Sequence, residues 1–454
     1  MAFISTKSWA VLAMGAAFAA PAAAELGAAD LAKLGTTLTP VGAERAGNAA
    51  GTIPAWTGGI TTPVAGYQAG QHYPDPYASD KPLFTITPSN VDQYKANLSP
   101  GEVAMFKKYP DYKMIVYPTH RSASFPACHY AETKECAANA RLSAGGNGVV
   151  GCSGGIPFPI PKNGNEAIWN SLLRYSGDTF GMNWDQAAVT RSGDYALVKF
   201  EYEYDFSYGN CSKPVSQREP NMKLNYLQTT TAPARLAGQI LLVHETVDQA
   251  KEPRSAWTYN PGQRRVRLAP NVAYDNPGTA ADGLRTNDDF GMYNGATDRY
   301  NWKLLGKREM YVPYNSYRLS DPKLKYSDIL KPGHINQDLA RYELHRVWVV
   351  DATLKPGMSH IYARRTFYID EDSWAILLID KYDGRGELWR TAELHNENWY
   401  NVPMFFGTVE VHNDLQSGRY IAMGLRNEEK MIYQPLKRTA ADYTPSALRG
   451  MGTR

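Results

Sequence analysis

The sequence predicts a β-rich α+β fold, in which helices cover the concave face of a large, curled antiparallel sheet. Two observations support this. From about residue 191 onward, apolar and polar residues alternate in segment after segment, which is typical of half-exposed strands. Short turn sequences such as residues 260–263 (NPGQ) separate these segments, so consecutive strands are predicted to pair as a meander, or half-barrel.

The clearest strand pattern lies in residues 195–208 (YALVKFEYEYDFSY), where Val198, Phe200, Tyr202 and Tyr204 alternate with charged residues. One face of this strand is therefore expected to be buried in the core and the other exposed to solvent. Similar patterns predict further strands at 221–228, 235–248, 255–268, 342–354, 360–370, 374–383, 386–395 and 407–425.

Helices are predicted before the sheet. Ser99, Pro100 and Glu102 form a capping box with proline at the first helical position. A second helix is expected from Glu166, with apolar residues on one face and Asn165 as its cap. We expect the helices near 90–109 and 165–176 to cover the concave face of the sheet.

The beginning of the chain resembles a cleavable leader peptide. Lys7 precedes a short apolar run, and Ala22–Ala24 fits the small-residue cleavage rule, so cleavage near Ala24 and a periplasmic location are expected. The predicted organisation is a signal peptide (1–24), an extended arm (25–88), a helical and loop region (89–190), the curled sheet (191–430) and a C-terminal tail (431–454).

All four cysteines lie after the predicted leader, so two disulfides are expected in an oxidising compartment. Four cysteines allow three pairings. We favour Cys128–Cys136 as a local loop and Cys152–Cys211 as a link to a strand end. A zinc site using Cys128, His129 and Cys136 is the rival, but its spacing fits no tight metal pattern.

The charge pattern indicates no nucleic-acid partner. The formal net charge is only +3, and the sequence has no long basic run. Four aspartates at 282, 288, 289 and 298 suggest calcium, but EF-hand spacing is absent, so solvated loop carboxylates and turn caps are the preferred interpretation. We therefore predict no metal and no cofactor.

Residues 151–155 (GCSGG) match the pattern of a hydrolase nucleophile at Ser153, with His129 or His244 as the base. That chemistry requires a sharp turn between a strand and a helix. Here Pro157, Pro159 and Pro161 prevent a helix directly after the serine. The segment is instead interpreted as a stiff entry that docks the following helix, and an exported serine esterase remains an alternative.

Several longer stretches resemble a large proteobacterial family of exported proteins of unknown function, often labelled outer-membrane lipoprotein-sorting-like. They are LTPVGAERAGNAAGTIPAWTGG, DPYASDKPLFTIT, GGIPFPIPKNGNEAIWN, RRVRLAPNVAYD, DRYNWKLLGKREMYVPYNSYRL and residues 343–390. The resemblance implies a relation to the periplasmic lipoprotein carriers of Lol type, with a half-barrel whose concave face is plugged by helices. It also implies association with export systems of the resistance-nodulation-division (RND) type.

The function predicted from both arguments is a non-enzymatic periplasmic carrier or chaperone that binds a lipid, lipoprotein or other hydrophobic cargo in the trough of the sheet. The alternative is a docking subunit of an RND-type envelope transporter, so inner- or outer-membrane transport proteins are candidate partners. The candidate trough residues are Trp257, Tyr259, Trp348, Val350, Tyr362 and Phe367. The candidate contacts for a head group or a partner protein are Arg264, Arg265, Arg267, Arg364 and Arg365.

Overall fold

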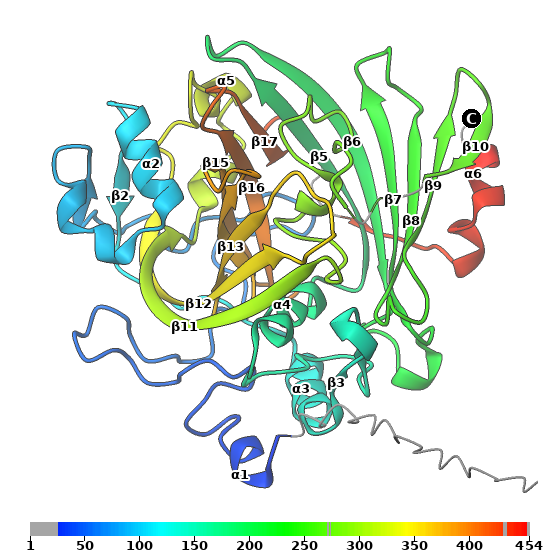
Figure 1. The fold of residues 1–454 in the computed structure, drawn as a ribbon, viewed down its shortest axis with the longest axis horizontal. Helices are drawn as coiled ribbons and strands as arrows, with labels where there is room; N and C mark the ends of the chain where they lie inside the picture. Colours follow the sequence, from blue (N-terminus) through cyan, green and yellow to red (C-terminus); the bar gives the residue numbers. More distant parts are fainter. Residues whose placement is uncertain (1–25, 270–271, 273, 430–433, 452–454) are drawn as a thin grey trace, which may run out of the picture.

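The computed structural model describes residues 26–269, 272, 274–429 and 434–451. Its main feature is a 16-stranded, strongly curled sheet that stays open (Figure 1), which confirms the predicted fold class. The pairing is antiparallel except where β2 meets β12. None of the described helices is long and apolar enough to cross a membrane. The predicted leader, residues 1–24, lies outside the described residues.

Two consecutive meanders build this sheet. The first contains β5 (Thr179–Val189), β6 (Tyr195–Phe206), β7 (Met222–Ala232), β8 (Ile240–Thr246), β9 (Ser255–Asn260) and β10 (Arg265–Leu268). The second contains β11 (Tyr300–Pro313), β12 (Tyr342–Leu354), β13 (Arg364–Asp370), β14 (Ile376–Tyr382), β15 (Leu388–Trp399), β16 (Met404–Asp414) and β17 (Tyr420–Leu425). Pairing of β17 with β5 joins the two meanders into one sheet.

Short strands and helices complete the fold. The strands are β1 (Phe84–Ile86), β2 (Met114–Val116), β3 (Arg141–Leu142), β4 (Val149–Val150) and β18 (Gln434–Pro435). The helices are α1 (Ala28–Leu31), α2 (Pro100–Lys108), α3 (Ala127–Asn139), α4 (Gly164–Leu173), α5 (Tyr326–Ile329) and α6 (Pro445–Met451). The meander strands alone supply most of the framework; β1 and β2 extend it beside β12, and β18 pairs with β5.

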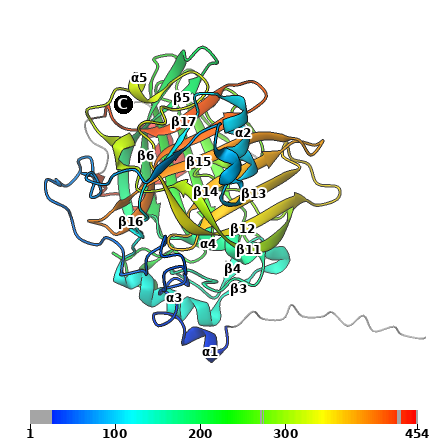
Figure 2. The same cartoon turned by 90° about the vertical axis from the view of Figure 1, so that its left-hand side faces the viewer.

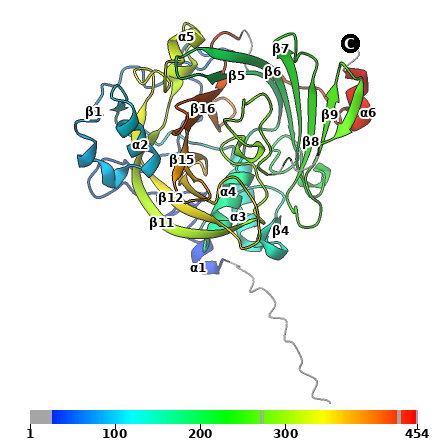
Figure 3. The same cartoon turned by 45° about the horizontal axis from the view of Figure 1, so that its top comes forward.

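The link between the two meanders folds back onto the concave face of the sheet. We call residues 274–299 of this link the cover loop. In Figures 1 and 3 this yellow-green loop lies inside the curl of the sheet. Its residues Ala281, Leu284 and Phe290 pack on the inner side of β5 and β17. The cover loop therefore bridges the two halves of the fold.

Of the two helices expected on the concave face, α4 lies there and α2 does not. The apolar face of α4, with Ile168 and Trp169, joins the central core. Helix α2 packs on the opposite face of β14 and β15 (Figure 2). A Cβ atom at Gly101 would overlap the side chains of Asp380 and Thr391, so this glycine permits the close approach of α2.

The helix caps follow local sequence rules. Ser99 and Glu102 form the predicted capping box of α2. The cap of α4 is Asn163, whose side chain accepts a hydrogen bond from the backbone N–H of Glu166, rather than the predicted Asn165. Asn165 instead donates its side-chain amide to the carbonyl of Gly146. The proline-rich entry thus ends two residues earlier than expected.

The amino-terminal arm is laid over the body of the protein, as predicted. Tyr73 is buried and stacks on Trp399 with ring centroids 5.2 Å apart. The indole N–H of Trp374 donates to the carbonyl of Val41 at 2.9 Å, and Arg121 donates to the carbonyl of Glu44 at 2.7 Å. Strands β1, β2 and β5 belong to the sheet although they precede residue 191, where the sheet was predicted to begin. The predicted boundaries between segments at residues 88, 190 and 430 therefore stay a proposal.

The two predicted disulfides are present, but the favoured pairing is wrong. Cys128 is bonded to Cys211, and Cys136 is bonded to Cys152. Cys128 and Cys136 both lie on α3, eight residues apart. A helical rise of about 1.5 Å per residue separates them by about 12 Å, beyond the reach of a disulfide. The missed feature is the length of α3, and the bonded sulfurs also exclude the zinc alternative.

These disulfides predict a measurable loss of stability. Replacing both Cys128 and Cys211 by serine opens a link across 83 residues, so we expect the free energy of unfolding to fall by about 2–4 kcal/mol. Urea denaturation measures this loss, and non-reducing peptide mapping checks the pairing. A Cys128–Cys136 peptide in the native protein would contradict the structure.

Candidate ligand-binding site

Two neighbouring cavities lie between the first meander and the cover loop. Their volumes are about 130 Å³ and about 90 Å³. Tyr204, Leu224, Phe290 and Asn294 line both and so form the wall between them. The cavities are therefore two parts of one hollow on the concave face, and the cover loop supplies half of the dividing wall.

The floor of the hollow is aromatic because of strand register. Phe180 on β5 is opposite Tyr204 on β6, which is opposite Tyr226 on β7. Tyr226 is in turn opposite Val243 on β8. Each of these side chains is less than one-tenth exposed. The alternation seen in the sequence at 198–206 thus does form one wall of an apolar trough.

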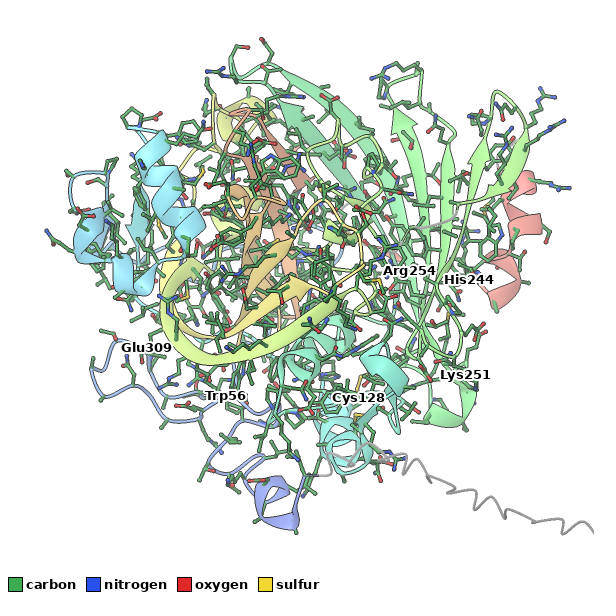
Figure 4. The ribbon with its side chains drawn as sticks, viewed as in Figure 1. Trp56, Cys128, His244, Lys251, Arg254 and Glu309 are labelled. Atoms are coloured by element: carbon green, nitrogen blue, oxygen red, sulfur yellow. A yellow bond between two sulfur atoms is a disulfide. The ribbon has the colours of Figure 1, made fainter. Side chains whose placement is uncertain are left out.

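Charged side chains border this aromatic floor. Lys223 donates to Glu245 at 3.1 Å, and Arg254 lies 3.3 Å from the other oxygen of the same carboxylate. Figure 4 shows Arg254 beside β7 and β8. Arg174, directly after α4, donates to the carbonyl of Phe405 at 2.9 Å. The hollow therefore combines a large apolar surface with a few polar groups, as small-molecule sites generally do.

A row of three buried cations on the second meander holds the cover loop. Arg365, Lys381 and Arg390 are directly opposite one another on β13, β14 and β15, and we call them the cation row. Like charges in opposite positions destabilise a sheet. Asp288 accepts a hydrogen bond from Arg365 at 2.9 Å, and Asp289 lies 2.8 Å from the ammonium nitrogen of Lys381. The two carboxylates of the cover loop thus neutralise the charges of Arg365 and Lys381, for which the cation row itself contains no anion.

The third cation of the row also contacts the cover loop. Arg390 donates to the carbonyl of Gly283 at 2.8 Å and to the hydroxyl of Tyr362 at 3.0 Å, and its Nε donates to Asp414 at 3.1 Å. Tyr362 donates to Asp289 at 3.1 Å. Backbone and side-chain contacts therefore fix the loop along the whole row.

A short relay connects the cation row with the hollow. The Lys381 ammonium group donates to Nδ1 of His412 at 2.8 Å, and Nε2 of His412 donates to Glu410 at 2.6 Å. Glu410 lines the larger cavity. Burial and the charge of Lys381 lower the pKa of His412, so the imidazole is neutral at pH 7. Hydrogen bonds and an ion pair therefore link Glu410, through His412 and Lys381, to Asp289 on the loop that closes the hollow.

The predicted trough residues do not form one site, although Val350 and Phe367 are directly opposite each other on β12 and β13. Trp257 and Tyr259 face the opposite side of the sheet, where Tyr443 and Leu448 cover them. Trp348 stacks on Trp374 with ring centroids 6.2 Å apart. The other three are fully buried: Val350 and Phe367 belong to the central core, and Tyr362 belongs to the network around Asp289. None of the six lines either cavity, so their role in ligand binding is not supported by position.

The predicted basic residues divide into exposed and buried groups. Arg264, Arg265 and Arg267 are exposed on the hairpin of β9 and β10. Arg364 is exposed and pairs with Asp351 at 2.8 Å. Arg365 is fully buried in the cation row, so it cannot meet a head group in this conformation. Alternation along β13 places these two neighbours on opposite faces of the sheet.

Two of the four aspartates in the link, Asp288 and Asp289, are not the solvated loop carboxylates that were predicted, whereas Asp282 is exposed. Asp288 and Asp289 are 2% and 0% exposed and carry the ion pairs to the cation row. Asp289 also caps its short helical turn with Thr286, as a turn cap should. The partners of these carboxylates are cationic side chains from distant strands, which no local pattern in the sequence reveals.

Ser153 has no catalytic surroundings. Its side chain is exposed, whereas His129 is fully buried in α3 against Phe125 and Tyr175. His244 bonds to the carbonyl of Tyr443 under α6. No hydrogen bond among the described residues joins Ser153 to a histidine, and Cys152 beside it is disulfide-bonded. The positions of His129 and His244 therefore give the esterase alternative no support.

A second buried polar cluster contains His345, Asp370 and Asp372, whose ligand-type atoms lie within 4.8 Å of one another. Arg121 binds both oxygens of Asp372 at 2.8 and 2.6 Å. Asp370 accepts hydrogen bonds from Tyr314 and Ser373. Because a guanidinium group already occupies Asp372, the cluster is best explained as the anchor that holds the amino-terminal arm.

The chain belongs to the family described as "Protein of unknown function (DUF1329)", whose profile matches residues 85–449. An uncharacterized protein of Pseudomonas aeruginosa is 56% identical over 434 residues, which are 95% of each chain. These matches confirm the family resemblance seen in the sequence.

Solved structures resemble the chain only distantly. A putative outer membrane lipoprotein-sorting protein domain from Vibrio parahaemolyticus is 11% identical, with a TM-score of 0.41, over 60% of this chain and 92% of that chain. A DUF1329 family protein from Desulfovibrio piger is 14% identical, with a TM-score of 0.40, over the same shares. A LolA superfamily protein from Nitrosomonas europaea is 14% identical, with a TM-score of 0.37, over 63% and 98%. At these scores the likenesses carry no argument about function.

Removal of one loop carboxylate should destabilise the protein strongly. Asp289→Asn leaves Lys381 buried beside a neutral group, so we expect the free energy of unfolding to fall by about 3–5 kcal/mol at pH 7. Burial raises the pKa of Asp289, but the ammonium group of Lys381 outweighs this and holds the pKa well below its usual value. The contribution is therefore complete above about pH 4 and is lost as the pH falls further.

Urea denaturation at pH 7 and pH 3 measures this difference, and hydrogen exchange of residues 274–299 reports on the loop itself. Asp282→Asn is the matched control, because Asp282 is 65% exposed by its side chain and pairs with Arg419 at the surface. Its cost should stay within about 1 kcal/mol. Equal effects of the two variants would contradict the role of the cation row.

Proposed function

We propose that this protein is a periplasmic carrier or chaperone, without catalytic activity, that binds a hydrophobic cargo on the concave face of its sheet. The observation that supports this most is the aromatic hollow between the first meander and the cover loop. Two disulfides favour an oxidising compartment such as the periplasm. The predicted leader agrees with this location.

The energetics of the hollow favour a chain-like apolar ligand. Burying about fifteen methylene groups gains on the order of 10 kcal/mol at about 0.8 kcal/mol each, before ordering costs. Neither cavity reaches the roughly 300 Å³ of a typical small-molecule pocket. A full-length chain therefore requires the wall between the cavities to move, and Phe290 and Asn294 are the two wall residues that lie on the cover loop rather than in the sheet.

A docking role in an envelope transport system is a second proposal. It rests on the hairpin of β9 and β10, where Arg264, Arg265 and Arg267 are exposed and Leu268 is 64% exposed. An apolar residue among exposed cations suits contact with a partner protein or an anionic membrane surface. This surface is on the edge of the sheet and does not compete with the hollow.

Native mass spectrometry of protein purified from the periplasm, followed by solvent extraction, tests the carrier proposal. We expect a discrete, stoichiometric apolar ligand on the wild-type protein. Leu224→Phe, which adds bulk to both cavities, should lose that ligand. Leu227→Phe makes the same change on the opposite face of β7, under α6, and should retain it.

A wild-type protein that stays free of ligand after incubation with lipid vesicles would contradict the carrier proposal. Loss of the ligand from both leucine variants would also contradict it, because Leu227 does not line the hollow.

A further inference from the structure

The lining of the hollow carries more positive than negative charge. Its described ionisable side chains are four bases and two acids: Arg174, Lys223, Arg254, Arg285, Glu245 and Glu410. The carboxylate of Glu245 forms ion pairs with two of these bases, Lys223 at 3.1 Å and Arg254 at 3.3 Å. Glu410 is bound to the neutral imidazole of His412 rather than to a cation of the hollow. Two positive charges are thus left over in an apolar environment.

Arg174 is the base whose charge is least compensated. It is half-buried at the end of α4, and its hydrogen bond to the carbonyl of Phe405 involves a neutral group. No carboxylate of the described part of the chain forms an ion pair with it. Burial lowers the pKa of Arg174 to about 10, so it remains charged at pH 7. A buried cation without an anion is costly unless something supplies the opposite charge.

Lys223 lies near Arg174 on the border of the larger cavity. Burial lowers the pKa of Lys223, the Glu245 carboxylate opposes this shift, and the charges of Arg254 and, to a lesser extent, Arg174 lower the pKa further. Farther along the hollow, Nε of Arg254 and Nε of Arg285 are buried and have no hydrogen-bond partner within the described residues. Unused donors, together with two cations that share one carboxylate and two that have none in the described part of the chain, therefore surround the same aromatic floor.

We propose that the cargo is an anionic single-chain amphiphile, whose head group binds Arg174 and Lys223 at the larger cavity while its chain lies on the aromatic floor toward the smaller one. This proposal rests on the carrier function and specifies its ligand class. The head group is a carboxylate or a phosphate monoester, because both offer oxygens to a guanidinium and an ammonium group at once. An uncharged chain satisfies the floor but leaves Arg174 without an anion, and leaves Lys223 with only the Glu245 carboxylate that it shares with Arg254.

Calorimetric titration of the delipidated full-length protein with dodecanoate and with dodecan-1-ol tests this directly. We expect dodecanoate to bind at least about 10-fold more tightly than the alcohol, the typical difference for a charge-assisted hydrogen bond. Arg174→Gln should remove most of this preference, because the carboxylate of dodecanoate then loses its guanidinium partner, whereas dodecan-1-ol carries no charge. Arg364→Gln is the control, because Arg364 pairs with Asp351 away from both cavities, and it should keep the wild-type preference.

The other possible outcomes of these titrations each contradict the head-group assignment. Equal binding of the acid and the alcohol to the wild type, or a preference that survives Arg174→Gln, overturns the head-group assignment and leaves the carrier proposal standing. Inorganic phosphate or acetate binding as tightly as dodecanoate overturns it too, since the site would then take a free anion without a chain. Binding of neither dodecanoate nor dodecan-1-ol would contradict both the assignment and the carrier function.

Discussion

The arrangement of the concave face depends on the three cations placed side by side on β13, β14 and β15. Strand register makes Arg365, Lys381 and Arg390 direct neighbours, and their burial removes the water that would screen them. The sheet is stable in this region because Asp288 and Asp289 enter from the link between the two meanders. Electrostatics, rather than apolar packing alone, therefore places the cover loop where it forms the roof of the hollow.

Different residues of the cover loop hold it on the sheet and line the hollow. Asp288 and Asp289 fix it to the second meander by buried ion pairs, and its aromatic residues Phe290 and Tyr293 line the hollow. Under the carrier proposal, a ligand displaces the side chain of Phe290 while the ion pairs hold the loop in register. The relay through His412 and Glu410 gives the hollow a physical connection to those ion pairs.

Local patterns in the sequence predicted much of the fold. Alternation revealed the strands from β6 to β10 and from β12 to β17 but missed β5 and β11, the second of which lies in a segment expected to be mostly loop. NPGQ revealed the hairpin of β9 and β10, and the capping box located α2. The disulfide pairing and the face covered by α2 depended on helix length and on packing between distant segments, which local patterns do not contain. The site was missed for the same reason: the aromatic floor was visible in β6, but Phe290, Asp288 and Asp289 lay in a segment without periodicity.

The central claim is that cargo binds in the hollow beneath the cover loop. Photo-crosslinking with a fatty acid that carries a diazirine near the end of its chain, followed by peptide mapping, tests it most directly. The account predicts crosslinks to β6, β7 and residues 274–299, and loss of those crosslinks when unlabelled fatty acid is added. Crosslinks confined to the face under α6 or to the hairpin of β9 and β10 would contradict it.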